Sequence, residues 1–177
     1  MTRSGGWVYL VACAAPPVLH IEQLISLLSD RRWKVCLVAT PTAATWTDLE
    51  DVAQRTGALF RAAARPPLQE KSLPRADAVL AAPLTFNTIN KWAAGYSDSP
   101  ALGVLNELLS ADLPILGAPC VKALLRQHPA YRGSLDRLMG AGVTMLDPDC
   151  ITFRGDDGLA DFSWSRVVSA FDALVAT

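Results

Sequence analysis

Short, continuously apolar segments alternate with segments of helical periodicity along most of the chain. The apolar runs are typical of buried strands and predict strands at 7–14, 33–39, 58–60, 77–82, 113–117 and 143–146. Helical spacing of apolar residues predicts helices at 18–29, 40–56, 85–94, 101–110, 121–127, 130–139 and 163–175. The segment 61–74 has little periodicity and contains Pro66, Pro67 and Pro74, so we expect a surface loop there.

This alternation indicates a parallel sheet whose strands are joined by right-handed helical crossovers. We therefore predict a flavodoxin-like (Rossmann-like) three-layer α/β/α sandwich with strand order 3-2-1-4-5, in one domain of residues 1–177. Ligands of such sheets bind beyond the carboxyl ends of the strands. The candidate site accordingly lies in four loops, at 13–17, 40–45, 82–88 and 118–122.

The charge balance argues against a nucleic-acid partner. Lys and Arg total 16 and Asp and Glu total 17, so there is no basic excess to neutralise a phosphate backbone. Apolar residues make up 51% of the chain and charged residues 19%, which is more apolar than an ordinary domain of this size. This surplus favours buried strands or a subunit interface.

Cysteine and histidine usage argues against a zinc site. The four cysteines form no CxxC pair, and the chain has only two histidines. The first apolar run ends at Pro16-Pro17 and lacks the context of a cleavage site, so it predicts a strand rather than a signal peptide. No apolar run reaches the length of a membrane span. We therefore expect a cytoplasmic protein without a membrane partner.

The four loops lack both the GxGxxG and the Walker fingerprint. Hydroxyls and an amide nevertheless stand at two predicted helix starts, at 40–42 and 85–88, where they suit either a phosphate or plain N-capping. Cys13 and Cys120 end strands, as small buried side chains or as reactive thiols. His20, near a helix start, favours a surface or capping role, and His128, before Pro129, favours a solvated loop position; each is alternatively a base.

Residues 82–91, with the sequence APLTFNTINK, resemble the A-P-A-S-A-N-T-I-x-K flavin motif of the homo-oligomeric flavin-containing cysteine decarboxylases. That family includes phosphopantothenoylcysteine decarboxylases and lantibiotic peptidyl-cysteine decarboxylases. Pro83, Asn87 and Thr88 match outright, and Thr85 stands where the family has Ser or Thr. Residues 95–98, GYSD, resemble the family's G-I-A-D.

Three further segments are in register with this family. Residues 118–130 keep the frame of its A-P-x-M-N-x-x-M-W-x-x-P-A segment, although Lys122 replaces Asn and Arg126 replaces Trp. Residues 11–15 stand where the family has G-V-T/S-G-S, and Thr40 matches its V-x-T-x-x-A segment.

The resemblance implies an FMN site and an oligomer. The residues that it assigns to FMN are Cys13, Ala14, Ala15, Thr40, Thr42, Thr85, Phe86, Asn87, Thr88, Asp98 and Ala118. Its candidate catalytic residues are Cys120 and Lys122, of which Lys122 would pair with a substrate carboxylate. The family also implies a trimer or a dodecamer, and the aromatic residues Phe86, Trp92 and Tyr96 suit such an interface.

One departure concerns the family's essential histidine. It lies in the loop before the strand that leads to the flavin motif, and the corresponding position here falls near Gln69. Glutamine cannot accept and return a proton as imidazole can. The sequence thus indicates an FMN-dependent oxidoreductase or decarboxylase that acts by a variant route on a cysteine-containing or carboxylate-bearing small molecule or peptide. The alternatives are a non-catalytic flavin-binding or regulatory subunit of a hetero-oligomer and a flavin-prenyltransferase-like enzyme.

Overall fold

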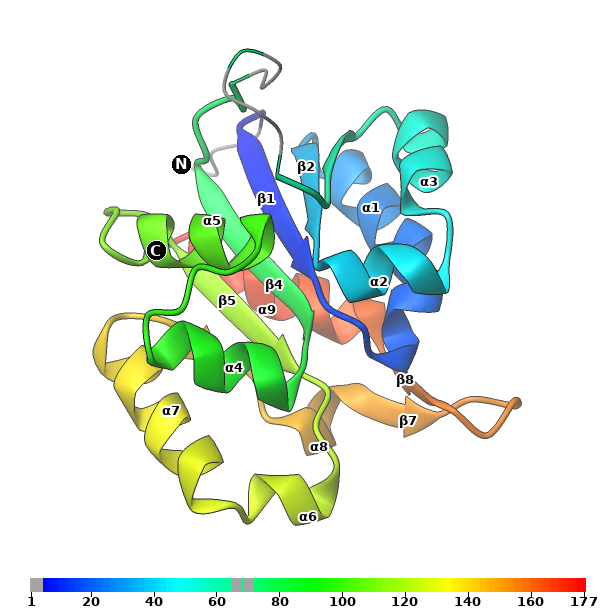
Figure 1. The fold of residues 1–177 in the computed structure, drawn as a ribbon. Helices are drawn as coiled ribbons and strands as arrows, with labels where there is room; N and C mark the ends of the chain where they lie inside the picture. The colour runs from blue at the N-terminus through cyan, green and yellow to red at the C-terminus, as the bar shows by residue number, and fades with distance from the viewer. Residues whose placement is uncertain (1–4, 65–67, 69–71) are drawn as a thin grey trace.

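A six-stranded parallel sheet forms the centre of the protein, seen in a computed structural model that describes residues 5–64, 68 and 72–177 (Figure 1). Its order is β3-β2-β1-β4-β5-β6. The strands are β1 (Trp7–Ala12), β2 (Lys34–Ala39), β3 (Leu59–Arg61), β4 (Ala78–Leu84), β5 (Ile115–Pro119) and β6 (Thr144–Met145). The predicted order 3-2-1-4-5 is confirmed, and β6 extends the sheet beyond β5.

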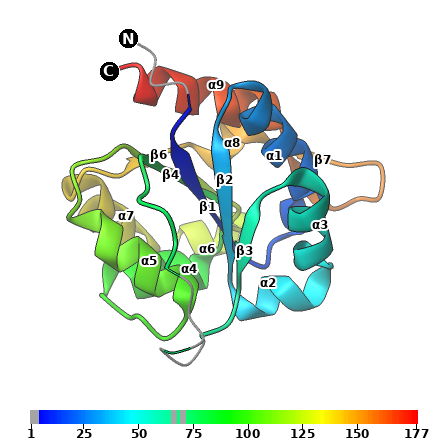
Figure 2. The same ribbon diagram turned by 90° about the horizontal axis from the view of Figure 1, so that it is seen from above.

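Helices cover both faces of the sheet, which is why the strands are almost continuously apolar (Figures 1 and 2). One layer contains α1 (Ile21–Asp30), α3 (Leu49–Thr56) and α9 (Trp164–Val175), and the other contains α4 (Phe86–Ala93), α5 (Pro100–Leu109) and α7 (Pro129–Gly140). Each helical layer encloses a core against the sheet, and successive residues of β1 point into opposite cores. Val8 and Leu10 pack in the core with α1, α3 and α9, and Tyr9 and Val11 pack in the core with α4, α5 and α7.

Two predicted helices have different bounds. The segment 40–56 forms two helices, α2 (Pro41–Trp46) and α3, because Thr47 is extended and Asp48 starts a new helix by accepting a hydrogen bond from Asp51 N at 2.9 Å. Before α1, the Pro16–His20 segment forms a 3-10 turn, η1.

The region after β6 contains an antiparallel hairpin that the hydrophobic pattern did not predict. It follows the short helix α8 (Pro148–Ile151) and consists of β7 (Thr152–Arg154) and β8 (Ala160–Phe162). Each strand has only three residues, too few to show the alternation of a strand in the sequence.

Two sequence expectations concern the surface. The prediction that Trp92 lies at a subunit interface is wrong, because the residue is only 1% exposed. Its Nε1 donates to Leu105 O at 3.2 Å inside the chain. The loop predicted at 61–74 lies partly outside the described residues, and so does Gln69. None of the helices in the described part of the chain is long and apolar enough to cross a bilayer.

Candidate functional site

The four loops predicted to form the site meet at the carboxyl edge of the sheet. Backbone hydrogen bonds join them to neighbouring strands: Cys13 N donates to Pro83 O at 2.9 Å, and Thr40 N donates to Ala12 O at 2.9 Å. Cys120 N donates to Leu84 O at 2.8 Å, which connects the fourth loop to the third. The sheet therefore brings these loops together although they are far apart in the sequence.

The loop before α4 is centred on two threonine hydroxyls. Thr85 Oγ1 accepts a hydrogen bond from Thr88 N at 3.3 Å and donates one to Thr88 Oγ1 at 3.1 Å. Cys13 lies against both, and its burial raises the pKa of the thiol more than hydrogen bonds to Thr88 and Thr85 lower it. The Cys13 thiol is therefore a neutral packing group rather than a nucleophile.

Thr40 has the same capping role at the start of α2. Its Oγ1 accepts a hydrogen bond from Ala43 N at 3.2 Å. Thr42 and Asn87, one on each helix start, are exposed, and neither side chain hydrogen-bonds to a described residue. The N-capping interpretation is thus confirmed for Thr40 and Thr85, while Thr42 and Asn87 present polar groups to the surface.

Phe86 and Asp98 have partners within the chain. Phe86 stacks on Tyr131 of α7 with ring centroids 6.2 Å apart and meets His128 edge-on at 5.6 Å. Asp98 Oδ2 accepts from Lys91 Nζ at 2.5 Å, so this ion pair joins the two segments that carry the flavin motif. Contact of either residue with a cofactor stays a prediction.

The three alanines assigned to the cofactor differ in burial. Ala118 is wholly buried in the core, Ala15 is 3% exposed, and Ala14 is partly buried. Neither the methyl group nor the backbone of Ala118 reaches the surface, so contact of Ala118 with a cofactor stays a prediction.

The end of β5 carries the two predicted catalytic residues. Lys122 is exposed and has no ion-pair partner among the described residues. Cys120 is half-buried; burial, and secondly the negative charge of Asp161, raise the pKa of its thiol to about 11. At neutral pH Cys120 is therefore a thiol, which argues against a nucleophilic role.

Both histidines have partners that the sequence did not reveal. His20 makes no side-chain capping hydrogen bond, and its Nδ1 instead lies 2.7 Å from Asp161 Oδ2 of β8. His128 caps α7, since its Nδ1 accepts from Ala130 N at 3.1 Å. Of the two roles predicted for His20, the surface position is confirmed at 44% exposure of the side chain, and the capping role is not. The solvated position predicted for His128 is confirmed as well, since this exposed residue precedes α7, and its side chain additionally caps that helix.

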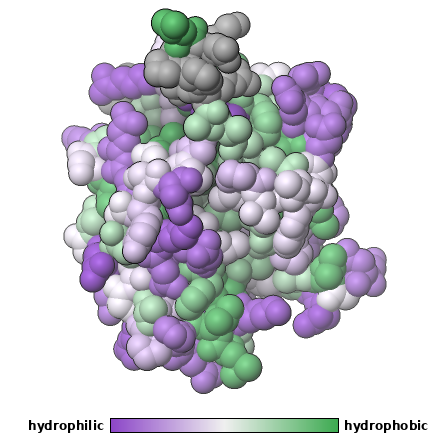
Figure 3. All heavy atoms as spheres, in the orientation of Figure 1, coloured by the Kyte–Doolittle hydropathy of each residue, from purple (hydrophilic) through white to green (hydrophobic). Residues whose placement is uncertain are grey.

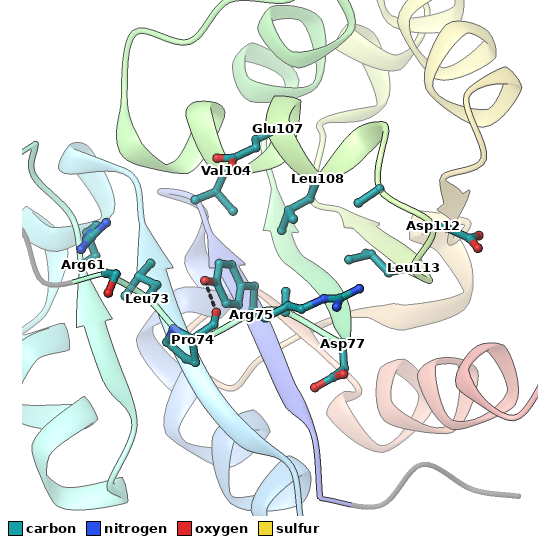
Figure 4. Close-up of a pocket in the computed structure, with 14 residues that line it drawn as sticks. Arg61, Leu73, Pro74, Arg75, Asp77, Val104, Glu107, Leu108, Asp112 and Leu113 are labelled. Carbon is teal, nitrogen blue, oxygen red and sulfur yellow. Dashed lines mark hydrogen bonds between the residues drawn. The ribbon is translucent and has the colours of Figure 1, made fainter.

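A cavity of about 650 Å³ lies on the α5 side of the sheet, near the amino ends of β4 and β5 (Figure 4). Arg61, Arg75, Glu107 and Asp112 line it, and Tyr9 Oη donates to Pro74 O at 2.6 Å inside it. None of the predicted site residues lines this cavity. In the described residues, no three His, Cys, Asp or Glu side chains gather as metal ligands would.

Comparison with known proteins supports the motif resemblance. A family model described as Flavoprotein matches residues 4–176. The coenzyme A biosynthesis bifunctional protein CoaBC of Thermococcus kodakarensis is 35% identical over 74 residues, which make up 42% of this chain and 18% of that protein. The match thus spans less than a fifth of that relative.

Solved structures share the fold over nearly the whole chain. A PPC decarboxylase variant complexed with pantothenoylaminoethenethiol has a TM-score of 0.77 at 19% identity, covering 98% of this chain and 100% of that one. The FMN binding protein AtHal3 has a TM-score of 0.77 at 21% identity, covering 95% of each chain. These identities show the fold alone, whereas the family match confirms the resemblance carried by residues 82–98.

Proposed function

The chain belongs to the Flavoprotein family, and on this premise we propose that it binds FMN at the carboxyl edge of its sheet. The observation that carries the proposal is the convergence of four loops, two of them at capped helix starts. These loops contain no acidic residue and one lysine, so a phosphate dianion meets no like charge within them. The exposed side chains of Thr42 and Asn87 would offer it a hydroxyl and an amide.

The donor groups of α4 fit a phosphate better than those of α2. In the first turn of α4, the only N–H group that donates to Thr85 Oγ1 is that of Thr88. The N–H groups of Phe86 and Asn87 have no partner among the described residues. In α2, Pro41 has no N–H to offer, and the helix has only six residues. We therefore assign the phosphate to the start of α4, with Asn87 as its principal side-chain ligand.

The proposed reaction is a flavin-dependent oxidation or decarboxylation of a cysteine-containing or carboxylate-bearing small molecule or peptide. When bound, FMN would supply the two-electron redox chemistry. Lys122 would bind the substrate carboxylate. Of the two basic residues that replace family residues at this end of β5, Arg126 is already paired with Asp149 at 3.0 Å, whereas Lys122 has no such partner in the described residues.

A flavin-binding subunit without its own chemistry is the second candidate. The substitution of the family histidine by a residue near Gln69, together with Lys122 and Arg126 in the substrate segment, favours it. Anaerobic mixing with a cysteine-ending peptide separates the two: an enzyme bleaches its flavin absorbance, and a carrier does not.

We also propose a single domain that assembles into a homo-oligomer, such as a trimer or dodecamer. Exposed apolar side chains support assembly: Leu124 is 80% exposed on α6 (Ala123–Arg126), and Phe153 is 50% exposed on the hairpin. Figure 3 shows apolar atoms over both elements. Light scattering should return a mass of several chains at micromolar concentration, and the mass of one chain would contradict this proposal.

The decisive experiment measures flavin in the purified protein. We expect a yellow protein that releases FMN, identified by mass, when it is denatured. Asn87→Leu should lose FMN without unfolding, because Asn87 is an exposed residue of a ligand loop. Gln54→Leu, an equally exposed amide in the last turn of α3, is the matched control and should keep FMN. A variant Asn87→Leu that remains yellow would contradict the assignment.

A further inference from the structure

Two side chains from distant parts of the chain form a hydrogen-bonded pair next to the first loop, and the charge of one of them acts on Cys120. His20 ends η1, directly after the first loop; Asp161 lies on β8; and Cys120 directly follows β5. The His20 and Asp161 side chains are 44% and 16% exposed, and their contact joins Nδ1 to Oδ2 at 2.7 Å. No flavin motif contains either residue.

The fold holds the hairpin against η1. Strand β8 contacts η1, and Figure 1 shows β8 beside the beginning of α1. The hairpin is fixed at its base, where Ser163 N donates to Ile151 O at 2.8 Å. Asp161 Oδ1 also accepts from the backbone N–H of Phe162 at 2.7 Å, which orients the carboxylate. His20 is therefore held by a positioned acceptor rather than by chance contact at the surface.

The hydrogen bond fixes the tautomer of His20. An ionised carboxylate only accepts hydrogen bonds, so the proton of a neutral His20 must be on Nδ1, and Nε2 carries the lone pair. Asp161 also acts on Cys120, whose pKa its charge raises. Of the other elements packed on η1, β4 has no titratable side chain, and Glu22 of α1 is paired with Arg55.

We propose that His20, oriented by Asp161, is the proton-transfer group of this site and takes the place of the histidine that the family has near position 69. The inference rests on the proposed function. In the step assigned to it, the S–H bond of a substrate thiol breaks, its electron pair stays on sulfur, and the proton forms an N–H bond at Nε2. Asp161 stabilises the resulting imidazolium, and the exposure of His20 lets the proton pass to solvent.

The first test measures proton transfer in the FMN-loaded protein. Stopped-flow mixing with a cysteine-ending peptide follows the loss of flavin absorbance. We expect His20→Gln to slow bleaching by about 10²–10⁴-fold, the usual contribution of a general base. His20→Ala should be equally slow and should recover with added imidazole, which a merely structural residue would not do. Gln54→Leu, on the exposed side of α3 and outside the four loops, is the control and should bleach at the wild-type rate.

The second test needs neither flavin nor substrate. The chain has only two histidines, so the imidazole 15N shifts of the apoprotein give two resolvable sets of signals. We expect the neutral form of His20 to be protonated at Nδ1 in the wild type and to lose this tautomer bias in Asp161→Ala, whereas His128 should not change. A neutral His20 protonated at Nε2 would overturn the proposal.

The outcomes separate this inference from the function on which it rests. A wild type that binds no FMN, or that binds it without bleaching, refutes the proposed reaction and with it any base. A wild type that bleaches, combined with unchanged rates in His20→Gln, refutes only the role of His20. The His20–Asp161 pair has only a structural role if imidazole does not restore a slow His20→Ala variant while His20→Gln bleaches at the wild-type rate. That result would also overturn the proposal.

Discussion

Substitution of Thr85 by alanine should destabilise the protein in a way that separates capping from ligand binding. The variant loses the hydrogen bond from Thr88 N to Thr85 Oγ1, and loss of such a cap costs about 1 kcal/mol. It also removes the hydrogen bond that Thr85 Oγ1 donates to Thr88 Oγ1. Because Thr88 is only 4% exposed, this loss costs about 1 kcal/mol more. We thus expect the free energy of unfolding to fall by about 2 kcal/mol.

The assay is urea unfolding of the apoprotein, followed by circular dichroism. With a slope of about 2 kcal/mol per molar urea, the midpoint should fall by about 1 M. Thr85→Ser keeps the hydroxyl and is the matched control, whose midpoint should stay close to that of the wild type. An unchanged midpoint in Thr85→Ala would refute the geometry of this cap.

Repeating the unfolding with FMN adds the ligand term. At a free FMN concentration of 100 times its dissociation constant, binding stabilises the folded state by about 2.7 kcal/mol. This increment should appear in the wild type and in Thr85→Ser but be absent in Asn87→Leu, whose apoprotein midpoint should be normal. Equal increments in all three proteins would show that Asn87 does not bind the phosphate.

Further predictions concern the end of β5. Lys122→Ala should weaken binding of a carboxylate-bearing ligand at least several-fold in a titration, and Lys122→Arg should keep it; equal affinities would exclude the proposed contact. Because the pKa of Cys120 is about 11, only about 0.1% of this thiol is ionised at pH 8, and iodoacetamide should alkylate exposed Cys150 long before Cys120, as followed by mass spectrometry. Asp161→Asn removes one of the two causes of that raised pKa and should speed alkylation of Cys120, although burial, the larger cause, remains. Because Lys122 and Arg126 replace family residues in the substrate segment, phosphopantothenoylcysteine should release carbon dioxide far more slowly than the rate of about 1–10³ per second usual for enzymes, and turnover in that range would show that these replacements do not exclude this substrate.

The sheet was predictable because its signal is local and repeated. Each buried strand is an apolar run bounded by turn residues, and alternation with helices leaves few topologies for a parallel sheet. The hairpin was missed for the opposite reason. Its turn signal, Asp157-Gly158, is present, with Gly158 at φ +79°, but it lies between strands of three residues. Because the hairpin was not predicted, the position of Asp161 was not predicted either. The same holds for its contact with His20, 141 residues away in the chain.

The sequence posed capping and ligand binding as alternatives at residues 85–88, and the structure shows why they are compatible. A helix start has four N–H groups without intrahelical acceptors, and one cap hydroxyl satisfies one of them. In α4 the Thr85 cap fixes the geometry of the turn, while Phe86 N and Asn87 N keep their hydrogen atoms available. The cap thus preorganises the donors, since the turn is already rigid before a ligand arrives. The pattern Thr-x-x-Thr alone does not tell whether a helix start also binds a ligand. That depends on the exposed surface that the neighbouring loops leave around Asn87.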